Sequence, residues 1–153
     1  MNTPRSRRPQ PEAFGAAILR LHAAIAKVAN GDTSAIKALY AHADDATSFY
    51  GWGGFEKGWQ AVSRRWDWAG RQFKGGTVAY QNVTMVETAA LAYTTDIETF
   101  TARLDGMEGR VTWSNRVTHI FRLCDGEWRL MHRHANRLEA QSAPSARLSS
   151  RTS

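Results

Sequence analysis

At 153 residues, of which 42% are hydrophobic, the chain is long enough for one domain with a single core. Its net charge of +6 suggests nucleic acid, but five of those six charges are arginines within residues 1–11 and 141–153, which contain no acidic residue. We therefore expect no nucleic-acid partner. The single cysteine, Cys124, excludes an internal disulfide, and no apolar run approaches the roughly 20 residues that span a bilayer. We expect a cytoplasmic protein without membrane contact.

The composition divides the chain into one domain and two tails. Residues 1–11 are rich in proline and arginine and have almost nothing apolar to bury. Residues 139–153 return to serine, arginine and alanine. Segments of this composition cannot bury enough apolar surface to offset the entropy that ordering costs. We therefore expect disordered tails on both sides of a single domain of residues 12–138.

Three helices are predicted in the first half of the domain. From residue 12 onward, apolar side chains recur three and four positions apart, the spacing of one helix face, until Asn30-Gly31 ends the pattern. A short second helix runs to Tyr40, and a third covers residues 56–73. Between them, residues 47–50 are β-branched and aromatic, which predicts a short strand followed by a glycine-rich loop.

Strands are predicted in the second half, where the hydrophobic period drops to two. They cover residues 77–87, 91–103, 110–123 and 127–136. Their links are only a few residues long, and such short links can join only antiparallel neighbours. The order predicts an α+β fold: three N-terminal helices packed on a strongly bent, mostly antiparallel sheet that forms a cone. A pocket inside the cone is the expected place for a small molecule.

The last two predicted strands carry three histidines, and one turn decides whether they share a face. Side chains two positions apart lie on the same face of a strand, so His132 and His134 point the same way. A two-residue turn at Asp125-Gly126 puts His119 on their face, whereas a three-residue loop with a bulge at Gly126 moves them to the opposite face. The apolar residues of the last strand favour the first register, but the sequence leaves both open.

Three residues are candidates for acid–base catalysis. Imidazole titrates near neutral pH, so His119 or His132 could act as a general acid or base. Asp44 precedes the first short strand and could face the pocket as a base, although acids in such a position are more often solvated. Three histidines and an acid could instead hold a metal ion. The His-x-His spacing is common by chance, however, and we expect neither a metal nor a cofactor.

Two acidic residues, Asp96 and Glu98, share one face of a predicted strand, where acids are disfavoured. We expect an arginine such as Arg116 or Arg103 to pair with them. The sequence contains no glycine-rich phosphate loop, no Ser-His-Asp order and no Cys-x-x-Cys pair, so no motif supports nucleotide binding or nucleophilic catalysis. Aromatic residues offer a lining for a small apolar ligand instead. The residues expected to bind it are Arg116, His134, Tyr40, Trp59, Trp66 and Trp113.

The segment RVTHIFRLCDGEWRLMHRHAN resembles the last two strands of the SnoaL-like branch of the nuclear transport factor 2-like superfamily, which also contains ketosteroid isomerase-like proteins. That family closes with an R-V-T-x-x-F-R segment, a D-G-x-W turn and an H-x-H ending. The matching residues are Arg116, Val117, Thr118, Phe121, Arg122, Asp125, Gly126, Trp128, His132 and His134. More weakly, the resemblance extends over about residues 12–138.

The resemblance implies an α+β cone with an internal pocket, commonly a homodimer through the outer sheet face. Isomerase-like members place a catalytic carboxylate where His119 stands here, so an imidazole would have to replace that base. The H-x-H ending also resembles the association domain of a calmodulin-dependent kinase, which oligomerises rather than catalyses. We therefore expect a homodimeric, cofactor-independent isomerase, cyclase or dehydratase that acts on an apolar, carbonyl-bearing ligand. The alternative is a non-catalytic dimerising or ligand-sensing module.

Overall fold

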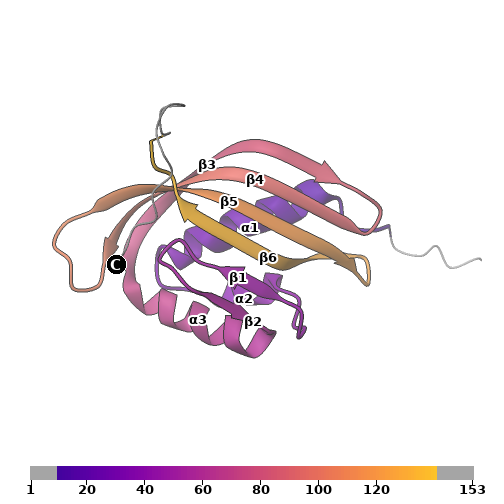
Figure 1. Ribbon diagram of the computed structural model, residues 1–153, viewed down its shortest axis with the longest axis horizontal. Helices are drawn as coiled ribbons and strands as arrows, with labels where there is room; N and C mark the ends of the chain where they lie inside the picture. Colours follow the sequence, from indigo (N-terminus) through magenta and orange to yellow (C-terminus); the bar gives the residue numbers. More distant parts are fainter. Residues whose placement is uncertain (1–9, 141–153) are drawn as a thin grey trace, which may run out of the picture.

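Three helices and six strands make up residues 10–140, the part of the chain that the computed structural model describes (Figure 1). The helices are α1 (Phe14–Val28), α2 (Ser34–Leu39) and α3 (Trp59–Gln72). The strands are β1 (Thr47–Phe49), β2 (Phe55–Lys57), β3 (Phe73–Glu87), β4 (Leu91–Leu104), β5 (Val111–Cys124) and β6 (Glu127–Arg137). This confirms the predicted α+β class. The tails expected at residues 1–11 and 139–153 lie almost wholly outside the described residues and stay predictions.

All six strands join one sheet, in the order β2-β1-β6-β5-β4-β3. The four long strands are antiparallel neighbours, as their short links require. β1 pairs in parallel with β6 and antiparallel with β2. Residues 55–57 were expected to be loop and helix, but they form β2 because the chain reverses over Gly53 and Gly54, both with positive φ. The third helix therefore begins at Trp59, three residues later than predicted for its start at residue 56.

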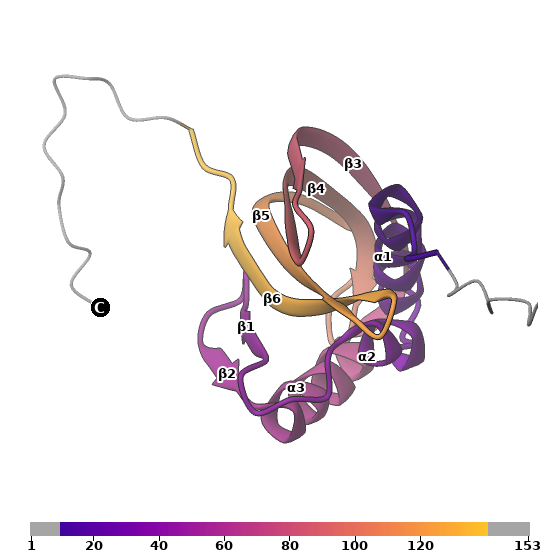
Figure 2. The ribbon, with the colours of Figure 1, turned by 90° about the vertical axis from the view of Figure 1, so that its right-hand side faces the viewer.

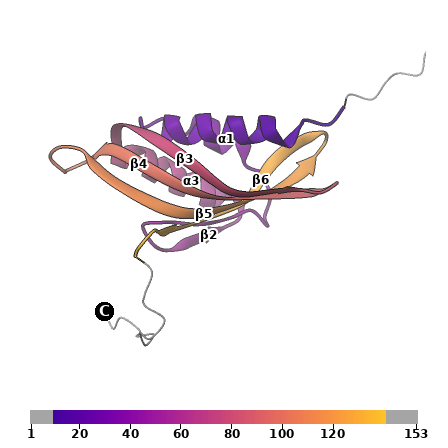
Figure 3. The ribbon, with the colours of Figure 1, turned by 90° about the horizontal axis from the view of Figure 1, so that it is seen from above.

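The sheet curls around the helices and makes the expected cone (Figure 2). Figure 3 shows α1 running lengthwise along one side of the curved sheet. The buried face of α1 carries apolar residues three and four positions apart, as the sequence predicted. From this face, Phe14 packs edge-on against Phe121 and Trp128, with 5.3 Å between the ring centroids in each pair. Aromatic packing therefore closes this end of the cone.

The turn between β5 and β6 has the two-residue form. Cys124 pairs with Glu127 across it. Asp125 and Gly126 both have positive φ, 50° and 84°, the conformation that Asp-Gly favours in a hairpin turn whose twist matches the strands. The bulge considered at Gly126 is therefore absent, and the strands leave the turn in the register that the apolar residues favoured.

A bulge farther along β6 reverses this register. Phe121 still pairs with Leu130, but the next pair is Ile120 with His132, so Met131 is an extra residue in β6. One extra residue sends every later side chain of a strand to the opposite face.

Beyond the bulge, Arg133 lies opposite His119 on the inner face, where both are buried. His132 lies half-buried and His134 exposed on the outer face. The expectation that a two-residue turn gathers all three histidines on one face is therefore wrong. Its physical reason is the bulge, which no local signal at the turn reveals.

Candidate functional site

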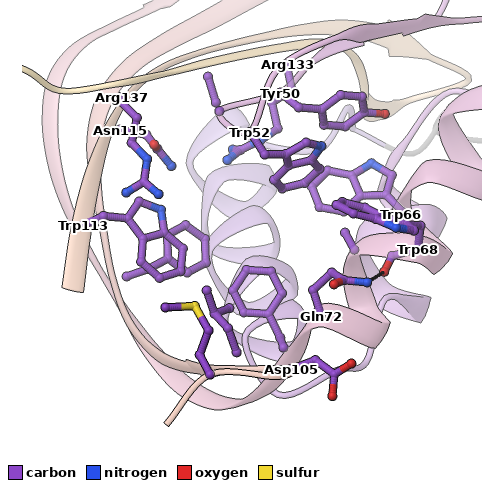
Figure 4. A pocket seen from close by; sticks show the side chains of 17 residues that line it. Tyr50, Trp52, Trp66, Trp68, Gln72, Asp105, Trp113, Asn115, Arg133 and Arg137 are labelled. Atoms are coloured by element: carbon purple, nitrogen blue, oxygen red, sulfur yellow. Dashed lines mark hydrogen bonds between the residues drawn. The ribbon is translucent and has the colours of Figure 1, made fainter. Parts of the chain in front are cut away.

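A cavity of about 290 Å³ opens between α3 and the sheet, at the end of the cone where β4 ends and β5 begins (Figure 4). The loop between β1 and β2, the inner face of α3 and the ends of the four long strands enclose it. Seven of its seventeen lining residues are aromatic, and its charged and amide side chains are Gln72, Asp105, Asn115, Arg133 and Arg137. A mostly apolar cavity with a few polar groups is the usual form of a small-molecule site.

Two aromatic walls bound the cavity. On the sheet side, Trp113 stacks on Phe100 with 5.1 Å between centroids and 6° between planes. On the side of α3, Trp52 stacks on Tyr50 at 4.8 Å, and Trp66 meets Trp52 edge-on at 6.4 Å. Figure 4 shows Trp113 on one side and the Tyr50, Trp52 and Trp66 group on the other. Such walls suit a flat apolar molecule.

Arg133 is the charged group that connects this cavity to a buried polar network. Its Nη2 donates to Glu98 Oε1 at 2.5 Å, and its Nη1 donates to Glu98 Oε2 at 3.1 Å. Nη1 also donates to His119 Nε2 at 2.7 Å. The side chain of Arg133 is 6% exposed and that of Glu98 is fully buried. Two acceptors therefore fix the plane of the guanidinium.

Asp96 forms the far end of the network. Its carboxylate accepts hydrogen bonds from Thr94 Oγ1 at 2.7 Å and from Asn82 Nδ2 at 2.9 Å. His119 Nδ1 lies 3.7 Å from Asp96 Oδ2 and 3.5 Å from Thr94 Oγ1. Since His119 Nε2 accepts from Arg133, the imidazole proton resides on Nδ1, toward Asp96.

Burial and pairing set the protonation states of the network. Burial would raise the pKa of Glu98, but Arg133 beside it outweighs that effect and holds the pKa below its ordinary value. Burial would likewise raise the pKa of Asp96, but the nearby His119 imidazole and the hydrogen bonds from Asn82 and Thr94 hold it low. Burial lowers the pKa of His119, which Asp96 only partly opposes. At neutral pH, Asp96 and Glu98 are therefore negatively charged, Arg133 is positively charged and His119 is neutral. The network carries one net negative charge.

A second set of polar atoms lies where α2, β1 and α3 meet beside the cavity. Tyr40 Oη, Ser48 Oγ, Tyr50 Oη and Trp66 Nε1 are buried, and within residues 10–140 none makes a hydrogen bond of good geometry, although Ser48 lies near both phenols and Trp66 near Tyr40. Burial raises the pKa of Tyr40 and of Tyr50, so both phenols stay protonated. An unsatisfied buried polar group costs about 1–3 kcal/mol.

The structure does not bring the three predicted acid–base residues together. His119 is fully buried on the inner face behind Arg133. His132 lies on the outer face, where its Nδ1 is 2.7 Å from Thr47 Oγ1. Asp44 is exposed in the loop before β1. Of the three, only His119 belongs to the polar network next to the cavity.

The predicted ligand-binding residues also divide. Trp66 and Trp113 line the cavity. Tyr40 is buried behind the cavity wall that Trp66 forms, with 6.5 Å between the two ring centroids. Trp59 stacks on His42 at 3.9 Å instead. Arg116 and His134 are exposed on the outer face of the sheet.

Arg133 is the important residue that sequence reasoning missed. The expected partners of Asp96 and Glu98 were Arg116 or Arg103, but Arg133 pairs with Glu98, and Asp96 has His119 beside it. Simple alternation from Trp128 and Leu130 places His132 and His134 on the inner face, and Arg133 between them on the outer face. The signal available was indirect: two inward-facing acids require a buried cation, which the bulge supplies.

The bulge also removes the three-histidine metal alternative, because it separates His132 and His134 from His119. Over residues 10–140, no three His, Cys, Asp or Glu side chains lie close enough together to hold a metal ion. In the same range, no helix is both long and apolar enough to cross a membrane.

Comparisons with known proteins agree with this fold. The family described as "SnoaL-like domain" matches residues 16–136. A search of curated proteins gave no match. Among solved structures, a nuclear transport factor 2-like superfamily protein from Salmonella enterica is similar, with a TM-score of 0.71 and 15% identity, covering 88% of this chain and all of that one (100%).

A ketosteroid isomerase-like protein from Erwinia carotovora is similar as well, with a TM-score of 0.70 and 16% identity. The match covers 82% of this chain and 94% of that protein. At these identities the likeness concerns the fold, an α+β cone, and leaves the activity to be argued from the site.

Proposed function

We propose that this chain, which belongs to the SnoaL-like domain family, binds a flat, mostly apolar molecule in its cavity and holds a carbonyl oxygen of that molecule at Arg133. The observation that carries the proposal is a buried arginine with unused donors beside an aromatic cavity. The aromatic walls would take the apolar part of the ligand, and the guanidinium would orient its oxygen.

The donor count of Arg133 supports this assignment. A guanidinium has five N–H groups. Three of them have acceptors in Glu98 and His119, which leaves two without a partner within residues 10–140. Because the network already carries one net negative charge, a neutral carbonyl fits these donors better than a carboxylate does.

The same geometry is suited to acid–base chemistry without a cofactor. An arginine that donates to a carbonyl oxygen also stabilises the enolate that forms when a neighbouring carbon loses a proton. His119, whose Nε2 accepts from Arg133 Nη1, holds the guanidinium in place while the two unused N–H groups meet the carbonyl oxygen. We therefore propose an isomerase, cyclase or dehydratase type of reaction, in which Arg133 stabilises the enolate and solvent in the cavity exchanges the proton.

A non-catalytic, ligand-sensing module is the second candidate. The observation in its favour is that Asp96, Glu98 and His119 are all already paired within the described part of the chain, so no interior base is free. Such a module would use the same cavity and the same arginine but would leave the ligand unchanged.

Binding of 2-acetylnaphthalene, a flat aromatic ketone, tests the proposal against 2-ethylnaphthalene, which has nearly the same shape but no oxygen. Quenching of tryptophan fluorescence reports both. We expect the ketone to bind about tenfold more tightly, the value of one hydrogen bond from a charged donor. The double variant Arg133→Met with Glu98→Leu, which removes both charges of the ion pair, should lose this preference, and Arg116→Met on the outer face should keep it. Equal binding of ketone and hydrocarbon by the wild type would overturn the proposal.

Hydrogen exchange separates the two candidates. In D₂O, an enzyme of the proposed type should exchange the methyl protons of the bound acetyl group for deuterium, which proton NMR detects. The exchange should disappear in the double variant Arg133→Met with Glu98→Leu, which cannot stabilise the enolate. Binding without any exchange would favour the ligand-sensing module.

A further inference from the structure

The orientation of Arg133 depends on a residue that never reaches the cavity. Arg133 Nη1 is held between Glu98 Oε2 at 3.1 Å and His119 Nε2 at 2.7 Å. Glu98 alone would fix the guanidinium in a fork, but the bond to His119 decides on which side of the fork the remaining N–H groups lie. His119 must present a lone pair at Nε2 for this bond to exist.

Asp96 gives His119 the required tautomer. The Nδ1 atom of His119 faces Asp96 Oδ2 at 3.7 Å and Thr94 Oγ1 at 3.5 Å, whereas its Nε2 faces Arg133. Thr94 donates its hydroxyl proton to Asp96, so both atoms facing Nδ1 are acceptors. Acceptors on this side draw the proton to Nδ1 and leave Nε2 free to accept. This also explains why a carboxylate is buried in the middle of β4 without a basic residue bonded to it.

We infer that Asp96 and His119 are positioning residues, which act through Arg133 to aim its free N–H groups at the ligand and make ligand binding depend on pH. The inference rests on the proposed function. Protonation of His119 at Nε2 would place two cations 2.7 Å apart, and Arg133 would have to give up this position. The cavity would then lose its oriented donors while its aromatic walls stay intact.

Other titratable and charged groups lie around His119, and any of them that gained a proton in the same pH range could also change ligand binding. Those facing the network are Asp96 and Glu98 from β4, Arg133 from β6, Tyr80 from β3, His22 from α1 and Tyr40 after α2. Of these, His22 alone is a second imidazole. It stacks on Tyr80 at 3.8 Å and makes no bond to Arg133, so its protonation would leave the guanidinium in place.

The test is the affinity for 2-acetylnaphthalene from pH 8 down to the most acid pH at which near-ultraviolet circular dichroism still shows the native fold. We expect the affinity of the wild type to fall about tenfold on the acid side, toward that of 2-ethylnaphthalene, whose affinity should not change. His119→Gln provides the matched variant, because the Gln carbonyl can accept from Arg133 but does not titrate. It should bind the ketone within about threefold of the wild type at pH 8 and keep that affinity down to the most acid pH.

Three further variants complete the test. His119→Leu removes the acceptor and should show the weaker affinity at every pH. Asp96→Asn removes the charge that raises the pKa of His119, so the fall in affinity should move to more acid pH. His22→Gln should leave the wild-type profile unchanged.

An acid-side loss that persists in His119→Gln, or that disappears in His22→Gln, would overturn this inference. In that case the protein would still bind the ketone more tightly than the hydrocarbon through Arg133, so the proposed function would stand. Failure of the proposed function has a different signature, namely equal affinities for ketone and hydrocarbon at pH 8.

Discussion

The closing hairpin follows opposite rules on the two sides of its bulge. Next to the turn, Trp128 and Leu130 enter the core and Arg129 stays at the surface, as simple alternation predicts. Beyond Met131 the alternation continues in the opposite phase, so Arg133 turns inward and the neighbouring histidines turn outward. A turn determines side-chain direction only as far as the ladder stays regular.

The two halves are also stabilised by different forces. The half beside the turn is held by aromatic packing, such as the contact of Trp128 with Phe14. The half beyond the bulge is held by a buried ion pair and its hydrogen bonds. Where apolar packing supplies the stability, the loss of one surface charge costs little. A buried charge that loses its partner is strongly destabilising. The residues of the second half are therefore those whose substitution should matter most.

The largest contrast is expected between the two arginines of β6. Arg133→Met should lower the free energy of unfolding by about 3–5 kcal/mol, because Glu98 would remain buried without a counter-charge. Arg129→Met should change it by less than about 1 kcal/mol, since the ion pair with Glu127 lies at the surface. Urea unfolding followed by tryptophan fluorescence measures both. Adding Glu98→Leu should restore most of the stability lost in Arg133→Met, and equal costs for the two arginine variants would contradict the comparison.

A smaller effect is expected from pH, and it should arise on the inner side of the hairpin. Burial lowers the pKa of His119 in the folded state, so below its ordinary value of 6.5 the unfolded chain binds a proton that the folded one does not. Stability should therefore fall with decreasing pH, by about 1.4 kcal/mol per pH unit until the folded-state pKa is reached. His119→Gln should remove this part of the dependence. Parallel stability curves for the wild type and His119→Gln between pH 7 and 5 would rule out a neutral, buried His119.

The smallest effects are expected on the outer face. His132→Ala removes the hydrogen bond with Thr47 and should cost about 0.5–1.5 kcal/mol. His134→Ala, at an exposed position, should change stability by less than about 0.5 kcal/mol. Neither should alter the binding of 2-acetylnaphthalene, which fluorescence titration checks. Loss of ketone binding in either variant would mean that the outer face takes part in the site.

Much of the fold was predictable because it follows from local patterns. The apolar stripe of α1, the period-two segments of the long strands and the few residues that link them depend on neighbours close in sequence. Of the residues predicted to bind a ligand, Trp66 and Trp113 line the cavity, and their binding role stays a prediction. The short strand β2 was missed because three residues gain strand structure only from β1 beside them.

By itself, the sequence determined the α+β cone and the antiparallel order of its long strands, but it left two forms of the turn at Asp125-Gly126 open. Only the tertiary structure decided the bulge at Met131, and with it the exchange of His132 and His134 for Arg133 on the inner face. The physical reason is that a bulge depends on pairing along the whole hairpin and on β1 at its other edge, not on the residues of the turn. The position of one extra residue thus brings Arg133, His119, Glu98 and Asp96 together beside the cavity.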